Sequence, residues 1–149
     1  MPGNAPYLFE FERADFADLN WMPLAMRYRL DVCGLKLSLA AWQALPFSDR
    51  VLLLDSPFGS PANNLAWISL LKTRVKDHGG EAPRDLEAWI DPSGMPDGVR
   101  EKLLDLSPSF TARHWKDLTP LQRYAIVKLA WGRQGTRYLS QAVAEFLRT

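Results

Sequence analysis

The sequence has little of the chemistry that marks an enzyme or a metal protein. Cys33 is the only cysteine, which excludes an intramolecular disulfide and a cluster of thiolate ligands within one chain. The two histidines, His78 and His114, belong to no zinc-binding spacing. The chain has no glycine-rich phosphate loop, no recognisable pair of catalytic carboxylates and no Ser–His–Asp pattern. We therefore expect no catalytic residue, metal or cofactor, and predict that the chain is not an enzyme.

The chain also lacks a long hydrophobic run. Residues 1–13 show no basic region followed by an apolar core, so we expect no signal peptide there. The longest apolar-rich stretch, Leu35–Phe47, is interrupted by Lys36 and Gln43 and is too short to span a bilayer. We expect a cytoplasmic protein that makes no contact with a membrane.

Net charge is small, at +1, but it is unevenly distributed. Residues 106–149 carry seven bases and two acids, whereas residues 81–105 carry three bases and seven acids. Such a layout orients a partner or an anionic ligand, or it pairs internally on folding, and we favour internal pairing. A pI near 7.9 is low for a nucleic-acid-binding domain, so we do not expect nucleic-acid binding.

What the chain does have is a series of helix boundaries set by local residues. With 149 residues, 47% of them apolar, the chain is long enough to bury a core of its own. We predict an all-α, single-domain bundle of about seven helices over residues 1–149. Serine or threonine caps, prolines and glycines delimit these helices. They are predicted at Pro23–Cys33, Ser38–Leu45, Ser48–Asp55, Ser60–His78, Pro96–Leu106, Pro120–Trp131, and from a Thr136 cap to the C-terminus.

Two segments are predicted to lie outside these helices. Phe9 and Phe11 alternate with Glu10 and Glu12, which is typical of a short strand or of an extended arm. Because no second strand is indicated nearby, we predict an extended N-terminal arm over residues 1–18. Residues 79–98 hold four glycines and three prolines and are predicted to form a long loop, with a possible helical turn at 85–90. A further helical turn is expected at 111–116.

The most informative stretch runs from Trp115 to Leu129. Thr119 followed by Pro120 and Gln122 forms a capping box with a proline at the first helical position. The helix that follows is apolar on nearly every side, which predicts a central position. It nevertheless contains Arg123 and Lys128, and cations in such a helix need partners.

Isolated reactive side chains favour structural roles. We expect Cys33, at a helix end, to be a buried and inert thiol, a reactive thiol being the alternative. His78 fits a helix C-terminus, and His114 is expected to be a surface or stacking residue and not a base. Residues 132–135 are predicted to form a turn, the alternative being an anion site at the next helix start.

Two blocks of the chain carry a distinctive residue pattern. The first comprises residues 11–16, Pro23, Arg27, Leu30, Asp31, Gly34, Lys36–Leu39 and Trp42; the second comprises Trp115, Leu118, Leu121–Ala125, Lys128 and Leu129. Together they resemble the conserved nitrate reductase-associated protein family. The resemblance covers residues 9–45 and 113–147, while residues 55–107 match in outline. Tyr124 stands where the family pattern leads us to expect phenylalanine, and the loop at 130–135 departs from the pattern.

The resemblance implies an accessory role around a molybdenum-dependent nitrate reductase. The leading hypothesis is a non-enzymatic accessory or maturation protein that contacts nitrate reductase or its molybdenum-cofactor machinery. The residues expected near that functional surface are Arg27, Asp31, Lys36, Trp42, Arg123, Lys128 and Arg137. The opposing interpretation is that these residues have a structural role, as helix caps or as members of a buried ion network. The sequence leaves the oligomeric state open.

The alternative hypothesis is a domain or enzyme that binds a small anionic ligand, pterin- or nucleotide-like. It predicts that Arg123, Lys128 or Arg137 converge in a pocket with aromatic walls. We also expect the two blocks to meet in space, with Asp31 or another acid answering Arg123.

Overall fold

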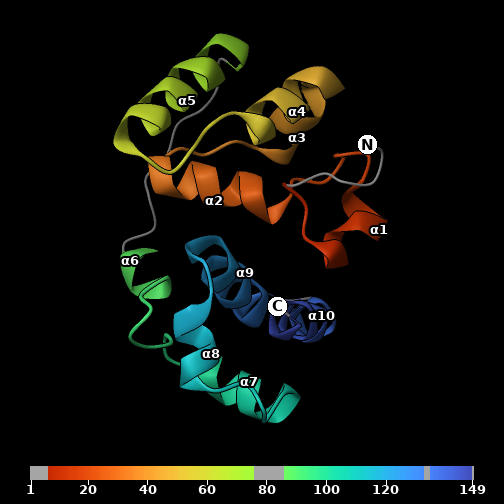
Figure 1. The fold of residues 1–149 in the computed structure, drawn as a ribbon. Coiled ribbons are helices and arrows are strands. Elements are labelled where there is room, and N and C mark those ends of the chain that lie inside the picture. Colours follow the sequence, from red (N-terminus) through yellow and green to blue (C-terminus); the bar gives the residue numbers. More distant parts are fainter. Residues whose placement is uncertain (1–6, 76–85, 133–134, 149) are drawn as a thin grey trace. The chain divides into compact units, whose positions relative to one another are not determined.

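A computed structural model describes residues 7–75, 86–132 and 135–148 (Figure 1). Within these residues the regular structure is entirely helical, with ten α-helices and one 3-10 helix, which confirms the all-α class. The chain divides into two compact units, residues 1–84 and 85–149. The boundary falls in the predicted loop at 79–98. That the chain forms a single domain stays a prediction.

The first unit is built from helical elements of 3 to 14 residues joined by loops (Figure 1). Local chemistry sets several of its boundaries. The hydroxyls of Ser38 and Ser60 accept the predicted capping hydrogen bonds, and Gly34 ends a helix in the left-handed region at φ 70°. The elements are η1 (Glu10–Glu12), α1 (Arg13–Phe16), α2 (Leu24–Cys33), α3 (Leu39–Ala44), α4 (Phe47–Asp55) and α5 (Pro61–Arg74).

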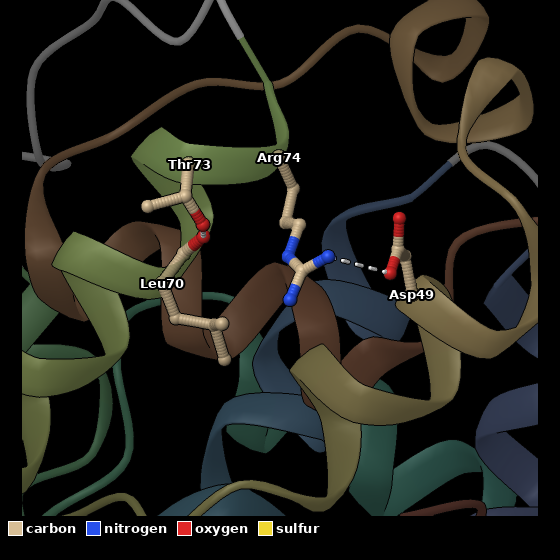
Figure 2. A network of polar contacts seen from close by, with 4 residues as sticks. All are labelled: Asp49, Leu70, Thr73 and Arg74. Carbon is tan, nitrogen blue, oxygen red and sulfur yellow. Dashed lines mark hydrogen bonds and ion pairs between the residues drawn. The ribbon is translucent and has the colours of Figure 1, made fainter.

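Helices α4 and α5 pack as antiparallel neighbours. The Arg74 guanidinium lies 3.4 Å from the Asp49 carboxylate, joining the end of α5 to the start of α4 (Figure 2). Near the end of α4, the Trp67 indole from the middle of α5 donates to the Leu53 carbonyl at 2.8 Å. Trp67 and Leu53 are fully buried, so the two helices share one apolar core.

Three predictions for the first unit are wrong in detail. The N-terminal arm is not extended, since η1 and α1 lie within it. Helix α4 begins at Phe47 with Pro46 as its N-cap, so Ser48 is not the cap. Helix α5, the longest described, ends at Arg74, because the next residue, Val75, is extended and buried. His78 lies outside the described residues.

Helix α9 is the centre of the second unit. It contacts α6, α7 and α10, and residues 123–127 are buried without interruption. The capping box is confirmed: Gln122 N–H donates to the Thr119 hydroxyl at 3.1 Å, and the Gln122 side chain accepts from Thr119 N–H at 2.9 Å. The elements are α6 (Leu86–Trp89), α7 (Val99–Leu106), α8 (Ala112–Asp117), α9 (Pro120–Trp131) and α10 (Gly135–Leu147).

The second unit also corrects some boundaries. Helix α7 begins at Val99 and not at Pro96, because Gly98 precedes it with a left-handed φ of 82°. Helix α10 begins at Gly135, so Thr136 is not its cap. The expected turns at 85–90 and 111–116 are helices α6 and α8, and with α1 they raise the helix count from seven to ten. Residues 133–134 lie outside the described residues.

Candidate functional site

Arg123 is a structural cation in the second unit. Its side chain is 6% exposed, and its Nε donates to the Ile90 carbonyl at 2.6 Å. One terminal nitrogen also donates to three carbonyls at the end of α8, those of Trp115, Lys116 and Leu118. A guanidinium is well suited to this work, because it keeps its charge and offers five fixed donors. The contacts favour the helix-capping interpretation of Arg123.

Lys128 is held by aromatic rings. Its Nζ lies 5.4 Å from the centroid of Trp89 and 5.8 Å from that of Tyr124, within cation–π range. Trp89 also makes an edge-on contact with Trp131 at 5.1 Å. Lys128 therefore holds Trp89, the last residue of α6, against the central helix. Arg123 holds the next residue, Ile90, through its carbonyl.

Arg137 is engaged elsewhere on α10. It is exposed, and its guanidinium lies 5.4 Å from the ring centroid of the adjacent Tyr138. Arg123, Lys128 and Arg137 thus each contact a different group. These contacts give no particular support to the predicted anionic pocket.

An acid near Arg123 does exist within the second unit. Hydrogen bonds from the backbone N–H and the hydroxyl of Ser93 lower the pKa of Asp91 below its usual value, and the charge of Arg123 adds to this. Asp91 belongs to the predicted loop at 79–98. The expected meeting of the two sequence blocks concerns both units and stays a prediction.

In the first unit, an unusual backbone conformation marks the connection between α1 and α2. Leu19 has φ 57°, the only positive φ at a non-glycine among the described residues, and its side chain is fully buried. Its carbonyl accepts from the Trp42 indole at 2.8 Å and from the Arg50 guanidinium at 2.9 Å. A left-handed conformation is unfavourable for leucine and persists where the surroundings enforce it.

Further side chains hold the same connection. The Asn20 carbonyl accepts from Gln43 at 3.0 Å, and the Met22 carbonyl accepts from Arg27 Nε at 3.5 Å. Asn20 N–H donates to the Asp18 carboxylate at 3.0 Å. We call residues 19–22 the Trp21 loop. The structure thus brings two predicted site residues, Arg27 and Trp42, together at this loop, although both act on its backbone.

Trp21 itself points out of this loop. It is 52% exposed, and within the described part of the chain it has no hydrogen-bond or ring partner. The other five tryptophans are all engaged. Trp42, Trp67 and Trp115 are buried and donate to carbonyls, while Trp89 and Trp131 contact each other.

A second exposed aromatic residue lies close to these contacts along the chain. Phe47, also 52% exposed, begins α4 one helical turn before Arg50, which bonds the Trp21 loop. We call the exposed side chain of Trp21 on its loop the Trp21 surface. Exposed aromatic side chains on a rigid backbone are typical of protein-binding surfaces.

The remaining predicted site residues of the first unit lie outside the contacts of the loop. Lys36 is exposed after the end of α2, and Asp31 is half-buried on that helix. Neither donates to nor accepts from the Trp21 loop in the contacts above. Their functional role stays a prediction.

Two residues that hold segments of the first unit together were not predicted from the sequence. Glu12 is 1% exposed, and its carboxylate accepts from Phe9 N–H at 3.2 Å and from Leu24 N–H at 3.0 Å. A carboxylate at the first residue of α2 is favoured by the helix dipole. Arg50 is the other, and both act on residues far away in the sequence. No local pattern distinguishes Glu12 from its charged neighbours Glu10, Arg13 and Asp15.

The remaining reactive groups show no catalytic arrangement in the described chain. Cys33 is half-buried, and burial raises the pKa of its thiol, an effect that Arg29 opposes. His114 is exposed, bonds Thr111 and lies against Phe110, as a stacking residue would. Across residues 7–75, 86–132 and 135–148, no group of three or more acidic, histidine or cysteine side chains is placed to hold a metal.

None of the described helices is both long enough and apolar enough to cross a membrane. The cytoplasmic location stays a prediction.

Comparison with known proteins gives one match. The model of the family described as conserved nitrate reductase-associated protein matches residues 8–146. The predicted resemblance is therefore confirmed, and it extends through the middle of the chain. No curated protein and no solved structure matches.

Proposed function

Because the chain belongs to the conserved nitrate reductase-associated protein family, we propose that it is a non-enzymatic accessory or maturation protein that acts by direct contact with nitrate reductase. The family name carries the association with nitrate reductase. Direct contact, the accessory role and a link to a molybdenum-dependent enzyme or its cofactor machinery are the proposal.

The single observation that supports contact is the exposure of Trp21 on a loop whose backbone is already fixed. A few large aromatic side chains supply most of the binding free energy in protein interfaces. A loop that is ordered before binding loses less conformational entropy when the complex forms. Trp21 meets both conditions, because the carbonyls on either side of it accept hydrogen bonds from α2, α3 and α4.

The anionic-ligand alternative lacks a comparable observation. It needs free cations beside aromatic walls, but Arg123 donates to four backbone carbonyls. Lys128 lies over Trp89 and Tyr124. We therefore favour the protein contact.

Capture of nitrate reductase tests the proposal. Purified chain, immobilised, is mixed with purified nitrate reductase, and bound enzyme is measured by its activity and by its mass. The wild-type chain and Leu65→Ala are expected to bind equally, because Leu65 is an exposed apolar residue of α5. Trp21→Ala is expected to bind at least about 30-fold more weakly, the loss typical of an interface hot spot.

Two results would contradict the proposal. One is the absence of binding by the wild-type chain to nitrate reductase or to its cofactor machinery. The other is normal nitrate reductase activity in cells that lack the gene. Equal binding by Trp21→Ala and wild type would instead exclude the Trp21 surface as the contact.

A further inference from the structure

Three of the four carbonyls of the Trp21 loop are already used within the first unit. Those of Leu19, Asn20 and Met22 accept hydrogen bonds from Trp42, Arg50, Gln43 and Arg27. An extended partner segment that adds to a sheet edge needs free backbone groups on both sides. With these three carbonyls engaged, the loop lacks a continuous row of available backbone groups, and its largest exposed group is the side chain of Trp21.

The side chain of Trp21 has a defined chemistry. It presents the faces of the indole ring and one N–H donor, and in the described chain that donor has no acceptor. A buried tryptophan normally finds a partner for this N–H, as Trp42 does with Leu19. A partner that buries Trp21 must therefore supply apolar walls and one oxygen acceptor.

Arg50 is placed to set the direction of Trp21. Its guanidinium donates to Leu19 O at 2.9 Å and to Gln43 O at 3.4 Å, and its Nε donates to Leu45 O at 3.0 Å. The fork thus ties the loop to the end of α3 and to the residue that links α3 to α4. Arg50 is only half-buried, so it is not a member of the apolar core.

The backbone conformation of Leu19 sets the direction in which the chain runs toward Trp21. Its left-handed φ of 57° turns the chain two residues before Trp21, while its side chain is fully buried. Because a left-handed φ is unfavourable for leucine, the donors on its carbonyl help to hold this conformation and, with it, the direction of the residues that follow.

We propose that Trp21 is a pre-set anchor, positioned by Arg50 through Leu19, that inserts into an apolar pocket of nitrate reductase lined with one oxygen acceptor. The inference rests on the proposed function for the identity of the partner. The positioning of Trp21 by Arg50 is testable without that partner.

Fluorine NMR separates the two parts. The full chain is labelled with 5-fluorotryptophan, and the Trp21 resonance is assigned by its loss in Trp21→Phe. Arg50→Met is expected to shift or broaden this resonance, and Arg50→Lys to restore it in part. Far-UV circular dichroism confirms that each variant is folded. Should Arg50→Met not fold, Gln43→Ala removes the donor to Asn20 O and is expected to perturb the same resonance.

Binding to purified nitrate reductase tests the pocket. Trp21→Phe keeps a ring but loses the N–H, and is expected to bind roughly 3- to 10-fold more weakly, the value of one hydrogen bond. Trp21→Ala is expected to lose at least about 30-fold. Because the contact is apolar, affinity is expected to change less than about threefold when the ionic strength rises from about 0.05 M to about 0.5 M.

Each failure has a distinct meaning. An unmoved Trp21 resonance in a folded Arg50→Met chain overturns the positioning role. Equal affinity of Trp21→Phe and wild type, or a steep loss with salt, overturns the apolar pocket with its acceptor. A wild-type chain that shows the expected resonances but does not bind nitrate reductase overturns the identity of the partner and, with it, the proposed function.

Discussion

Trp42 and Arg50 donate to the same oxygen, the carbonyl of Leu19, at 2.8 and 2.9 Å. Leu19 lies in a loop between α1 and α2, where its carbonyl has no helical N–H as a donor. Trp42 and Arg50 supply the donors instead. Together they satisfy a buried acceptor and fix the backbone beside Trp21.

The same combination of side chains recurs in the first unit. Trp67 and Arg29 both donate to the carbonyl of Leu53, at 2.8 and 2.9 Å. Arg29 also donates to Ser56 O at 2.7 Å and lies 5.0 Å from the ring centroid of Phe58. Arginine and tryptophan thus close the end of α4, where helix carbonyls have no partner within the helix.

A related arrangement occurs in the second unit. Arg123 donates to Ile90 O, and Trp115 donates to the next carbonyl, Asp91 O, at 2.8 Å. Three of the six tryptophans therefore serve as buried donors to the backbone.

Replacing Trp42 by phenylalanine is expected to lower the free energy of unfolding by about 1–2 kcal/mol, because most of the ring packing stays while Leu19 loses one donor. Urea denaturation measures the change. Trp21→Phe is the matched control and is expected to leave stability within about 0.5 kcal/mol of wild type, because Trp21 is exposed. Equal losses in the two variants would refute the distinction between a structural and a surface tryptophan.

Arg123→Met is expected to lower the free energy of unfolding by about 3 kcal/mol, because four backbone carbonyls lose their cationic donor. Lys116→Met, an exposed change on α8, is expected to stay within about 0.5 kcal/mol of wild type. Thermal and urea unfolding provide the comparison. At temperatures where Arg123→Met is folded, its capture of nitrate reductase should match wild type; a selective loss of capture would instead assign Arg123 to the binding surface.

Cys33 is expected to react slowly. Burial raises the pKa of its thiol, and although Arg29 opposes the shift, less thiolate is present at neutral pH than in a free cysteine. Alkylation by iodoacetamide near pH 8 should be slower in the folded chain than in the chain unfolded by urea. Faster alkylation in the folded chain would indicate a reactive thiol.

The same shift has a consequence for stability. The unfolded thiol ionises at lower pH than the folded one, so the unfolded chain binds fewer protons in that range. The contribution of Cys33 is therefore fully present below the unfolded pKa and is lost as pH rises through the folded pKa. Comparison of Cys33→Ser with wild type across that range measures it.

Asp91 is expected to titrate below its usual range, because Ser93 donates to its carboxylate through both N–H and hydroxyl, at 2.8 and 2.7 Å, and Arg123 adds a favourable charge. A lowered pKa means that the stabilisation is present above the unfolded pKa and is lost as pH falls through the folded pKa. Carbon-detected NMR titration should show the pKa of Asp91 rising in Ser93→Ala. A titration unchanged by this substitution would show that the Ser93 hydroxyl does not contribute.

Sequence determined the features that depend on near neighbours. Thr119 and Gln122 cap α9 from three residues apart, and Gly34 ends α2 by its own left-handed backbone. Helix α9 was predicted at its observed bounds for this reason. The apolar run from Tyr124 to Val127 also indicated its central position.

Features that depend on partners far away in the sequence could not be predicted from the sequence. The N-terminal segment alternates like an arm, but the Glu12 carboxylate bonds Leu24 N–H, twelve positions away, and the segment folds into η1 and α1. Arg50 resembles any exposed base of a helix, although its acceptor on Leu19 is 31 positions away. No local pattern encodes either bond.

Residue chemistry by itself determined the all-α class, the capped central helix and, through its two blocks, the family. Tertiary structure decided which tryptophans are buried donors, and it left Trp21 exposed with no ring or hydrogen-bond partner among the described residues. The physical reason is that six tryptophans have equal apolar surface, and only the placement of carbonyls and of Arg50 by packing distinguishes Trp42 from Trp21.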